Sequence, residues 1–237
     1  MVIHLISGPR NISTALMYSF AQRGDMKVMD EPFYAFYLIL TGLEHPGKDE
    51  ILKTLEPDPK KVFTQIKSLE QKHGNVFIKN MGHHLQGFDY SSIVLFQNVF
   101  LIRDPGQMLL SYAKVREQPT LNDIGLKQQA ELFAWLQAEG QQPIVLDGNE
   151  LRKNPSVILE KLCEQLGLPF TKAMLSWPAG PRAEDGCWAP YWYTQVHQST
   201  NFMPPEPDTT SLPNYLLHTY EEALPYYTTL KNYALKA

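Results

Sequence analysis

The sequence predicts a single α/β domain in which helices cover both faces of a central parallel sheet. Two observations carry this prediction. Short apolar runs alternate with segments of helical spacing along the 237 residues, and no internal repeat or linker divides the chain. The length is sufficient to bury one large core. We therefore expect one domain over residues 1–237, built as three layers of helix, sheet and helix.

The first expected unit is a strand, a turn and a helix near the N-terminus. Residues 2–6 (VIHLI) are an apolar run that stops at the Ser-Gly-Pro of residues 7–9, as a buried strand does when it enters a turn. From Ser13 the apolar residues recur with helical spacing. The Arg-Gly pair at 23–24 is a typical C-terminal stop, so we expect a helix between these points.

The rest of the chain repeats this alternation. Apolar runs predict further strands at residues 27–29, 75–79, 98–102 and 143–146, and helical spacing predicts helices within 46–74, from Pro105 to about Val115, and over 122–139, 155–167 and 213–236. Pro225 lies inside the last of these, so we expect a kinked helix or two helices there. The segment 176–211 is rich in Pro, Gly, Trp and Tyr, has no regular period, and is expected to be irregular.

Composition excludes several classes of protein. With 21 Lys and Arg against 25 Asp and Glu, the chain has a formal net charge of −4, which disfavours a general nucleic-acid binder. Its two cysteines, Cys163 and Cys187, cannot form a disulfide scaffold or a four-thiolate metal site. The first residues do not form a secretory signal, and no apolar run is long enough to span a membrane. We expect a cytoplasmic protein without a nucleic-acid partner; its oligomeric state stays open.

Polar and charged groups follow four of the expected strands. The strands end in the loop 7–14, in Asp30-Glu31, in Lys79-Asn80 and in Arg103-Asp104. Ligands of an open parallel sheet bind at the carboxyl ends of its strands. The loop carries two hydroxyls at a helix start, where free N–H groups and the helix dipole favour an anion. The sequence therefore predicts a pocket for a ligand with several negative charges.

The first loop is not the phosphate-binding loop of a kinase. That loop needs G-x-x-x-x-G-K-[ST], with a lysine at the β- and γ-phosphates and a hydroxyl on Mg²⁺. Here Ser13 follows Gly8 by five residues, and Thr14 stands in the place of the lysine. A nucleoside triphosphate with magnesium is thus disfavoured, and a diphosphate-like ligand held without a metal fits better.

The motifs resemble those of the sulfotransferases that use 3′-phosphoadenosine 5′-phosphosulfate (PAPS). Residues 9–16 (PRNISTAL) look like the 5′-phosphosulfate loop, and Arg103-Asp104-Pro105 followed by Ser111-Tyr112 looks like the 3′-phosphate site. Residues 75–79 look like the strand whose final lysine faces the sulfuryl group, and 145–169 is similar to a structural helix signature of the family. The resemblance implies a P-loop NTPase-like sulfotransferase fold and PAPS as co-substrate, with adenosine 3′,5′-bisphosphate as product and no metal.

The resemblance also implies roles for single residues. Arg10 and Lys79 would hold the transferring group, and Glu31, as in the tyrosylprotein and bacterial branch, would take the acceptor's proton. Donor-binding residues would be Pro9, Arg10, Asn11, Ser13 and Thr14 at the 5′ end, Arg103 and Ser111 at the 3′ end, and Arg182 and Trp188, which match the family's closing loop only loosely. The acceptor would be a small molecule, a peptide or a carbohydrate with a hydroxyl or amine.

Departures from the family pattern leave alternatives open. Ile12 replaces the loop glycine, Ala15 stands where cytosolic members carry an adenine-stacking tryptophan, and Met81 stands where they carry the catalytic histidine. The base is therefore Glu31, Asp30, His83 or His84, and a structural alternative for Glu31 is a cap of the next helix.

Structural alternatives also exist for other segments. The loop could be an ordinary turn capped by Ser13, Lys79 a strand-end lysine, and the aromatic segment 176–211 either a lid or a packing cluster. Two other functions remain as alternatives: a P-loop-like nucleotide or nucleoside kinase, and a nucleotide-binding module without catalysis.

Overall fold

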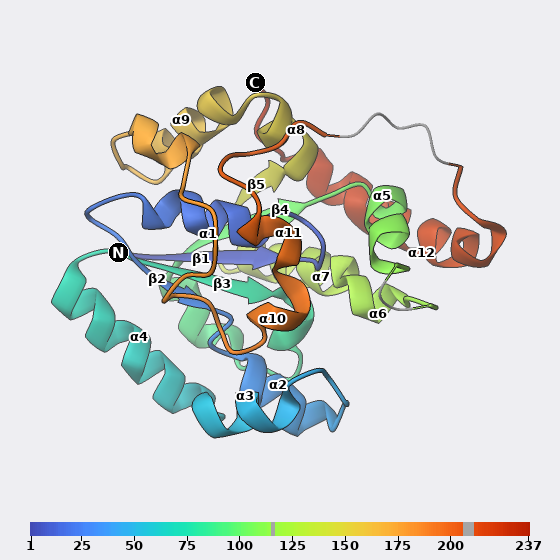
Figure 1. The fold of residues 1–237 in the computed structure, drawn as a ribbon, viewed down its shortest axis with the longest axis horizontal. Coiled ribbons are helices and arrows are strands. Elements are labelled where there is room, and N and C mark those ends of the chain that lie inside the picture. The colour runs from blue at the N-terminus through green and yellow to red at the C-terminus, as the bar shows by residue number, and fades with distance from the viewer. Residues whose placement is uncertain (115–116, 206–210) are drawn as a thin grey trace.

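The computed structural model describes residues 1–114, 117–205 and 211–237. Five parallel strands form one sheet in the order β2-β3-β1-β4-β5. They are β1 (Val2–Ser7), β2 (Lys27–Asp30), β3 (Val76–Met81), β4 (Gln97–Ile102) and β5 (Ile144–Asp147). All five lie where the apolar runs predicted them, so the expected parallel sheet is confirmed (Figure 1).

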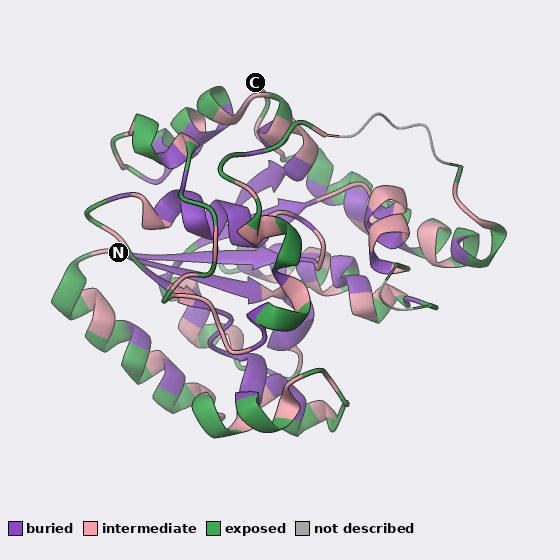
Figure 2. Cartoon of the chain, in the orientation of Figure 1, coloured by how far each residue is buried: buried purple, intermediate pink, exposed green. Residues whose placement is uncertain are grey.

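The central strand β1 is buried on both faces, as its unbroken apolar run requires. Val2 and Ile6 join one core cluster, whereas Ile3 and Leu5 join the other, because successive strand side chains point to opposite faces. Figure 2 shows the sheet as a buried layer between partly exposed helices. The chain therefore has the predicted three layers.

The helices are divided between the two faces of the sheet. One face is covered by α4 (Pro59–His73), α5 (Pro105–Tyr112), α7 (Leu126–Ala138) and α12 (Asn214–Lys231), and the other by α1 (Ser13–Ala21), α8 (Gly148–Lys153), α9 (Pro155–Gln165) and the 3₁₀ turn η3 (Lys172–Leu175). On α4, Val62 and Ile66 are the buried residues, which gives an otherwise charged helix its apolar face.

A smaller third cluster lies beside the carboxyl ends of β2 and β3. It joins residues of α2 (Tyr34–Thr41), α3 (Lys48–Thr54) and α10 (Ala189–Trp192), with Trp188 and Tyr193 flanking α10. The 3₁₀ turns η1 (Gly82–Leu85) and η2 (Tyr90–Leu95) follow β3, and α11 (Thr194–His197) follows α10. Part of the aromatic segment 176–211 thus packs against α2 close to the strand ends.

Three predicted helices differ from the observed ones. The helix expected over 122–139 is two helices, α6 (Leu121–Ile124) and α7, because Gly125 takes a left-handed conformation at φ 69° between them. α12 continues through Pro225 as one element, so the two-helix alternative is wrong. The helix from Pro105 ends at Tyr112; its expected end at Val115, like residues 206–210 of the aromatic segment, lies outside the described residues.

Candidate active site

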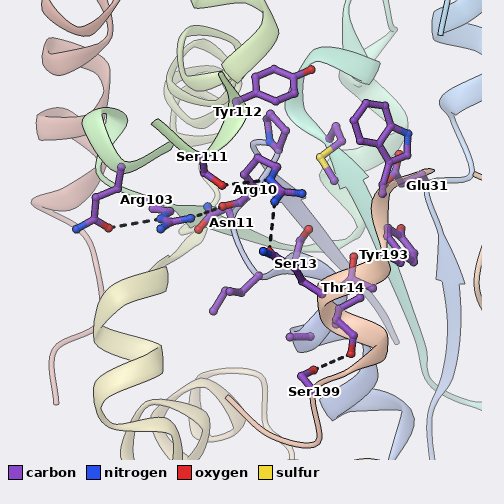
Figure 3. Close-up of a pocket in the computed structure, with 18 of the residues that line it drawn as sticks. Arg10, Asn11, Ser13, Thr14, Glu31, Arg103, Ser111, Tyr112, Tyr193 and Ser199 are labelled. Carbon is purple, nitrogen blue, oxygen red and sulfur yellow. Dashed lines mark hydrogen bonds between the residues drawn. The ribbon is translucent and has the colours of Figure 1, made fainter. Parts of the chain in front are cut away.

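A cavity of about 470 Å³ opens at the carboxyl ends of the strands. Its volume falls in the range of small-molecule sites, which is roughly 300–1,000 Å³. The lining residues come from the first loop, the ends of β2 to β4 and the C-terminal segment; of the predicted site residues, Pro9, Arg10, Asn11, Ser13, Thr14, Glu31, Arg103, Ser111 and Trp188 line it. Figure 3 shows Arg10, Asn11, Arg103 and Ser111 on one side and Glu31 and Tyr193 on the other.

The first loop leaves the N-terminus of α1 without a side-chain cap. The N-cap residue is Ile12, whose apolar side chain cannot form a capping hydrogen bond. Ser13 is the first helical residue, so the alternative of a turn capped by Ser13 is wrong. The first N–H groups of a helix have no partner within it and attract anions. Ser13 and Thr14 add two hydroxyls at the same point, and both residues line the cavity.

The loop holds two residues in strained backbone conformations. Arg10 and Ile12 lie in the left-handed region, at φ 58° and 53°. A β-branched residue rarely adopts this conformation, and such strain of order 1–3 kcal/mol is typical of binding loops. Ile12 therefore holds a left-handed conformation that the glycine expected here from the resemblance would adopt without strain.

Contacts from β4 and α8 hold this strained loop in place. Asn11 donates from Nδ2 to the Leu101 carbonyl at 2.7 Å, and Arg103 Nη1 donates to the Arg10 carbonyl at 2.6 Å. Gly148 permits the approach, because a Cβ at that position would lie 2.6 Å from Asn11 Oδ1. The Nδ2 of Asn11 is thus engaged in shaping the loop, whereas its buried Oδ1 has no hydrogen-bond partner within the described residues.

Arg10 reaches the serine that was expected at the opposite end of the ligand. Its Nε donates to Ser111 Oγ at 3.2 Å, and its Nη2 donates to Gln195 Oε1 at 3.3 Å. Arg103 Nε lies 3.5 Å from Gln107 Oε1, which also accepts from Asn149 Nδ2 at 3.0 Å. The residues predicted to bind the two ends of the nucleotide are therefore joined by hydrogen bonds into one continuous group.

Lys79 lies beneath the cavity with its ammonium surrounded by oxygens. Its side chain is fully buried, and its Nζ lies 2.7 Å from Asp30 Oδ1 and 2.7 Å from Glu31 Oε1. The hydroxyls of Tyr193, at 2.5 Å, and Thr14, at 3.3 Å, complete the group. An ammonium has three N–H donors, so the contact with Thr14, the most distant of the four oxygens, is the weakest. The alternative of a solvated strand-end lysine is excluded by this burial.

Asp30 and Glu31 are neighbours with different surroundings. Asp30 Oδ2 accepts from the Tyr193 hydroxyl at 2.7 Å and from the Gly186 N–H at 3.2 Å, while its Oδ1 faces Lys79. Glu31 instead lines the cavity, and the contact of its Oε2 is His84 Nδ1 at 3.6 Å, beyond hydrogen-bonding distance. Of the two carboxylates, Glu31 has an oxygen left for a ligand.

One ammonium faces two buried carboxylates, which changes the acidity of this pair. Burial raises the pKa of Glu31 to about 7, the Lys79 ammonium opposes the shift, and the charge of Asp30 adds to it. For Lys79, burial lowers the pKa, but the carboxylates of Asp30 and Glu31 more than offset it, so that the pKa rises. Lys79 is therefore charged, and Glu31 is the carboxyl that exchanges a proton near neutral pH. Glu31 also has φ 41°, a further strained position.

The neighbouring histidines are packed against tyrosine rings. His84 stacks between Tyr34 and Tyr37, with ring centroids 4.3 and 4.8 Å away. Burial, followed by the nearby His83, His45 and Lys79, lowers the pKa of His84 well below its usual value, so that it is neutral. His83 and His84 both line the cavity. A neutral, stacked imidazole next to Glu31 is not a charged partner of that carboxylate.

Of Trp188 and Arg182, the two residues predicted from the family's closing loop, only Trp188 lines the cavity. Trp188 lines the cavity, is buried, and donates its indole N–H to the Tyr193 hydroxyl at 3.1 Å. Arg182 lies outside the cavity: its guanidinium stacks over the Tyr18 ring at 4.4 Å, and its Nη2 donates to the Pro178 carbonyl. Donor binding by Arg182 therefore has no support in this geometry.

Tyr193 and Gln195 are the site residues that sequence reasoning missed. Both lie in or next to the short helices of the aromatic segment, which has no period from which their orientation could be predicted. Their partners, Lys79 and Arg10, are 114 and 185 residues away in the chain. Only the fold of the segment over the strand ends reveals them.

Residues 1–114, 117–205 and 211–237 contain neither a cluster of metal-ligating side chains nor a helix suited to span a membrane. No group of three or more His, Cys, Asp and Glu side chains is arranged to hold a metal ion there. Nor does any helix in these ranges have both the length and the apolar character needed to cross a membrane.

The fold is shared with solved sulfotransferase structures. The sulfotransferase domain of the Synechococcus PCC 7002 olefin synthase superposes with a TM-score of 0.58 at 16% identity over 93% of each chain. The sulfotransferase domain of the curacin biosynthetic pathway gives 0.55 at 15% identity, covering 93% of this chain and 96% of the other. A sulfotransferase from Alicyclobacillus acidocaldarius gives 0.53 at 12% identity, covering 99% and 96%. The predicted fold class is confirmed.

Sequence similarity extends further and identifies the family. Two curated proteins of Arabidopsis thaliana, named branched-chain-amino-acid aminotransferase-like protein 2 and protein 1, are 40% and 39% identical over 233 and 235 residues. These matches cover 97% and 98% of this chain but 41% and 42% of the relatives, so the chain spans about two fifths of their length. The family profile described as "Sulfotransferase domain" matches residues 1–234, and the chain belongs to that family.

Proposed function

We propose that this domain transfers a sulfuryl group from PAPS to the hydroxyl or amine of an acceptor. One observation carries the proposal: a single cavity brings the uncapped N-terminus of α1, Arg103 with Ser111, and the Glu31–Lys79 pair together. The first two are anion-binding groups, and the third pairs a buried cation with a carboxyl of pKa near neutrality.

The residues that line the cavity fit a donor with a phosphate at each end of an adenosine. Ser13, Thr14 and the first N–H groups of α1 would bind the 5′-phosphate. Arg103 and Ser111 would bind the 3′-phosphate, since a guanidinium forms paired hydrogen bonds to phosphate oxygens. Arg10, whose hydrogen bonds lead to Ser111 and Gln195, would exchange these neutral partners for the anionic donor. We propose that this binding needs no metal ion.

The chemistry proposed here is an in-line displacement at sulfur. An acceptor oxygen or nitrogen forms a bond to sulfur while the bond between sulfur and the 5′-phosphate oxygen breaks, leaving adenosine 3′,5′-bisphosphate. Glu31 takes the acceptor's proton through Oε2, the oxygen that Lys79 does not hold. Lys79 lies next to Thr14 and stabilises negative charge around the transferring group. Asp30 is the weaker candidate for the base because both of its oxygens are already engaged.

The acceptor is proposed only by class: a small molecule, a peptide or a carbohydrate. Its side of the cavity contains Glu31, Tyr34, His84 and Trp192. Cytoplasmic location and the absence of a nucleic-acid partner remain predictions from composition.

The names of the two Arabidopsis relatives refer to an aminotransferase. We infer that this activity belongs to the part of those proteins that this chain does not match, because the sulfotransferase profile accounts for residues 1–234 here. The test is to supply the purified chain with pyridoxal phosphate and branched-chain amino acids. We expect no transamination, and measurable turnover would contradict the inference.

A thermal-shift comparison tests the proposed donor. Adenosine 3′,5′-bisphosphate in the presence of a chelator is expected to raise Tm, because a ligand at 100 times its Kd stabilises the native state by about 2.7 kcal/mol. Stabilisation by ATP only with Mg²⁺ would instead favour a kinase.

A second assay separates catalysis from binding. PAPS labelled in its sulfuryl group is incubated with a panel of alcohols, phenols, amines, peptides and sugars, and labelled products are detected by mass spectrometry. Binding of adenosine 3′,5′-bisphosphate without any transfer would favour a non-catalytic module.

A further inference from the structure

Tyr193 occupies the centre of the charged group beneath the cavity. Its hydroxyl accepts from Lys79 Nζ at 2.5 Å and from the Trp188 indole N–H at 3.1 Å, and it donates to Asp30 Oδ2 at 2.7 Å. A phenol hydroxyl has one donor and two acceptor sites, so each is used. The residue is buried, with an exposed fraction of 5%. These contacts fix the direction of every hydrogen bond that the hydroxyl makes.

The contacts join the aromatic segment to the ends of β2 and β3. Gly186 donates its N–H to the same oxygen of Asp30 that accepts from Tyr193. Gly186 also packs against the Trp188 ring so closely that a Cβ there would lie 2.2 Å from it.

We propose that Tyr193 is a positioning residue, whose hydroxyl holds the Lys79 ammonium between Asp30 and Glu31 so that Glu31 keeps Oε2 toward the cavity. This inference rests on the proposed role of Glu31 as the base. Asp30 accepts from Tyr193, Gly186 and Lys79 together, which makes it the anchor of the aromatic segment. Lys79 donates hydrogen bonds to Tyr193 and Thr14 and forms ion pairs with Asp30 and Glu31, so the Tyr193 hydroxyl helps to fix the ammonium between the two carboxylates. The aromatic segment thereby supplies part of the catalytic group.

The proposal predicts a change in the acidity of Glu31 when the hydroxyl is removed. The titratable groups around Glu31 are Asp30, Tyr34, Lys79, His84 and Tyr193. The charge of Asp30 disfavours the charged form of Glu31. Without the Tyr193 hydroxyl, Asp30 loses the hydrogen bond at its Oδ2 and competes more strongly with Glu31 for the Lys79 ammonium. Tyr193→Phe is therefore expected to raise the pKa of Glu31, and Asp30→Asn to lower it.

The experiment is a ¹³C NMR titration of the side-chain carboxyls in protein labelled at glutamate. Glu31→Gln identifies the signal of Glu31. The matched control is Tyr191→Phe, which makes the same change two residues away on α10, where the side chain is 52% exposed. Isothermal calorimetry with adenosine 3′,5′-bisphosphate on the wild-type protein tests the proposed function separately.

The expected result is a pKa of Glu31 about one unit higher in Tyr193→Phe, as weakening of its one charged contact with Lys79 implies, and unchanged in Tyr191→Phe. A folded Tyr193→Phe protein with the wild-type pKa overturns the proposal. If that variant does not fold, Asp30→Asn tests the same group, because it removes the acceptor of the Tyr193 hydroxyl and the charge that competes with Glu31 for Lys79. A fall in the pKa of Glu31 is expected there, and an unchanged pKa overturns the proposal.

Failure of the positioning role of Tyr193 and failure of the proposed function give different results. Wild-type protein that binds no adenosine 3′,5′-bisphosphate, while Tyr193→Phe still shifts Glu31, refutes the proposed function and not the positioning.

Discussion

Replacing Lys79 with methionine tests the charged group beneath the cavity. The change keeps the apolar stem but leaves Asp30 and Glu31 without the ammonium that lies 2.7 Å from each. Removing one partner of a buried ion pair costs about 3–5 kcal/mol, because the other charge stays buried. For a domain of this size, each kcal/mol changes Tm by roughly 2–4 °C. We therefore expect Lys79→Met to lower Tm by roughly 10 °C, which calorimetry or circular dichroism would measure.

The pH dependence of this variant gives a second readout. Without the ammonium, which opposes the effect of burial, the pKa of Glu31 rises further above that of the unfolded chain. The folded state then takes up protons as the pH falls, so the deficit relative to the wild type shrinks toward pH 5. Lys127→Met is the matched control, because its ammonium is half-exposed and lies 3.8 Å from Glu131. Equal Tm values for Lys79→Met and Lys127→Met at neutral pH would refute the reasoning.

Three further substitutions test separate parts of the account. Glu31→Gln is expected to reduce sulfuryl transfer by about 10²–10⁴-fold and to abolish a rise of the wild-type rate with pH that levels off above about 7; an unchanged profile would exclude Glu31 as the base. Arg103→Ala is expected to weaken the binding of adenosine 3′,5′-bisphosphate by roughly 10- to 150-fold, as measured by calorimetry, and that of 5′-AMP less, since 5′-AMP loses only the contact by which Arg103 supports the first loop. Equal losses for both ligands would place the 3′-phosphate elsewhere. Burial lowers the pKa of His4 from 6.5 to about 4, so this residue removes about 3 kcal/mol of stability as the pH falls through that window, while the raised pKa of Glu31 acts in the opposite direction. Relative to the wild type, the free energy of unfolding of His4→Gln should therefore increase from pH 7 toward pH 5, as measured by urea denaturation. A pH profile identical to that of the wild type would contradict this.

Sequence reasoning predicted the sheet because buried parallel strands require continuous apolar runs, and β1, β3, β4 and β5 each have one. The edge strand β2 has only Val28 and Met29 between charged residues. It also predicted which strand ends carry the site, since polar groups that follow such strands meet at one edge. Helix boundaries were less predictable. The break at Gly125 depends on one left-handed glycine within a continuous helical pattern.

The parts of the site that could not be predicted depend on contacts across the chain. The pattern Asp30-Glu31 does not reveal which carboxylate faces the cavity, because this depends on Tyr193 and Gly186 binding Asp30. In the same way, Arg182 has a suitable charge, but the ring of Tyr18 holds it outside the cavity. Aperiodic segments such as 176–211 give no orientation for their side chains, so their partners follow only from the fold.

A crystal structure with adenosine 3′,5′-bisphosphate, grown with a chelator, tests the central claim most directly. The account predicts the 5′-phosphate at the N-terminus of α1 beside Ser13 and Thr14, and the 3′-phosphate against Arg103 and Ser111, with Arg10 released from Ser111 to the ligand. A nucleotide bound outside this cavity, one bound with its two phosphates exchanged, or one that binds only through a magnesium ion would contradict it.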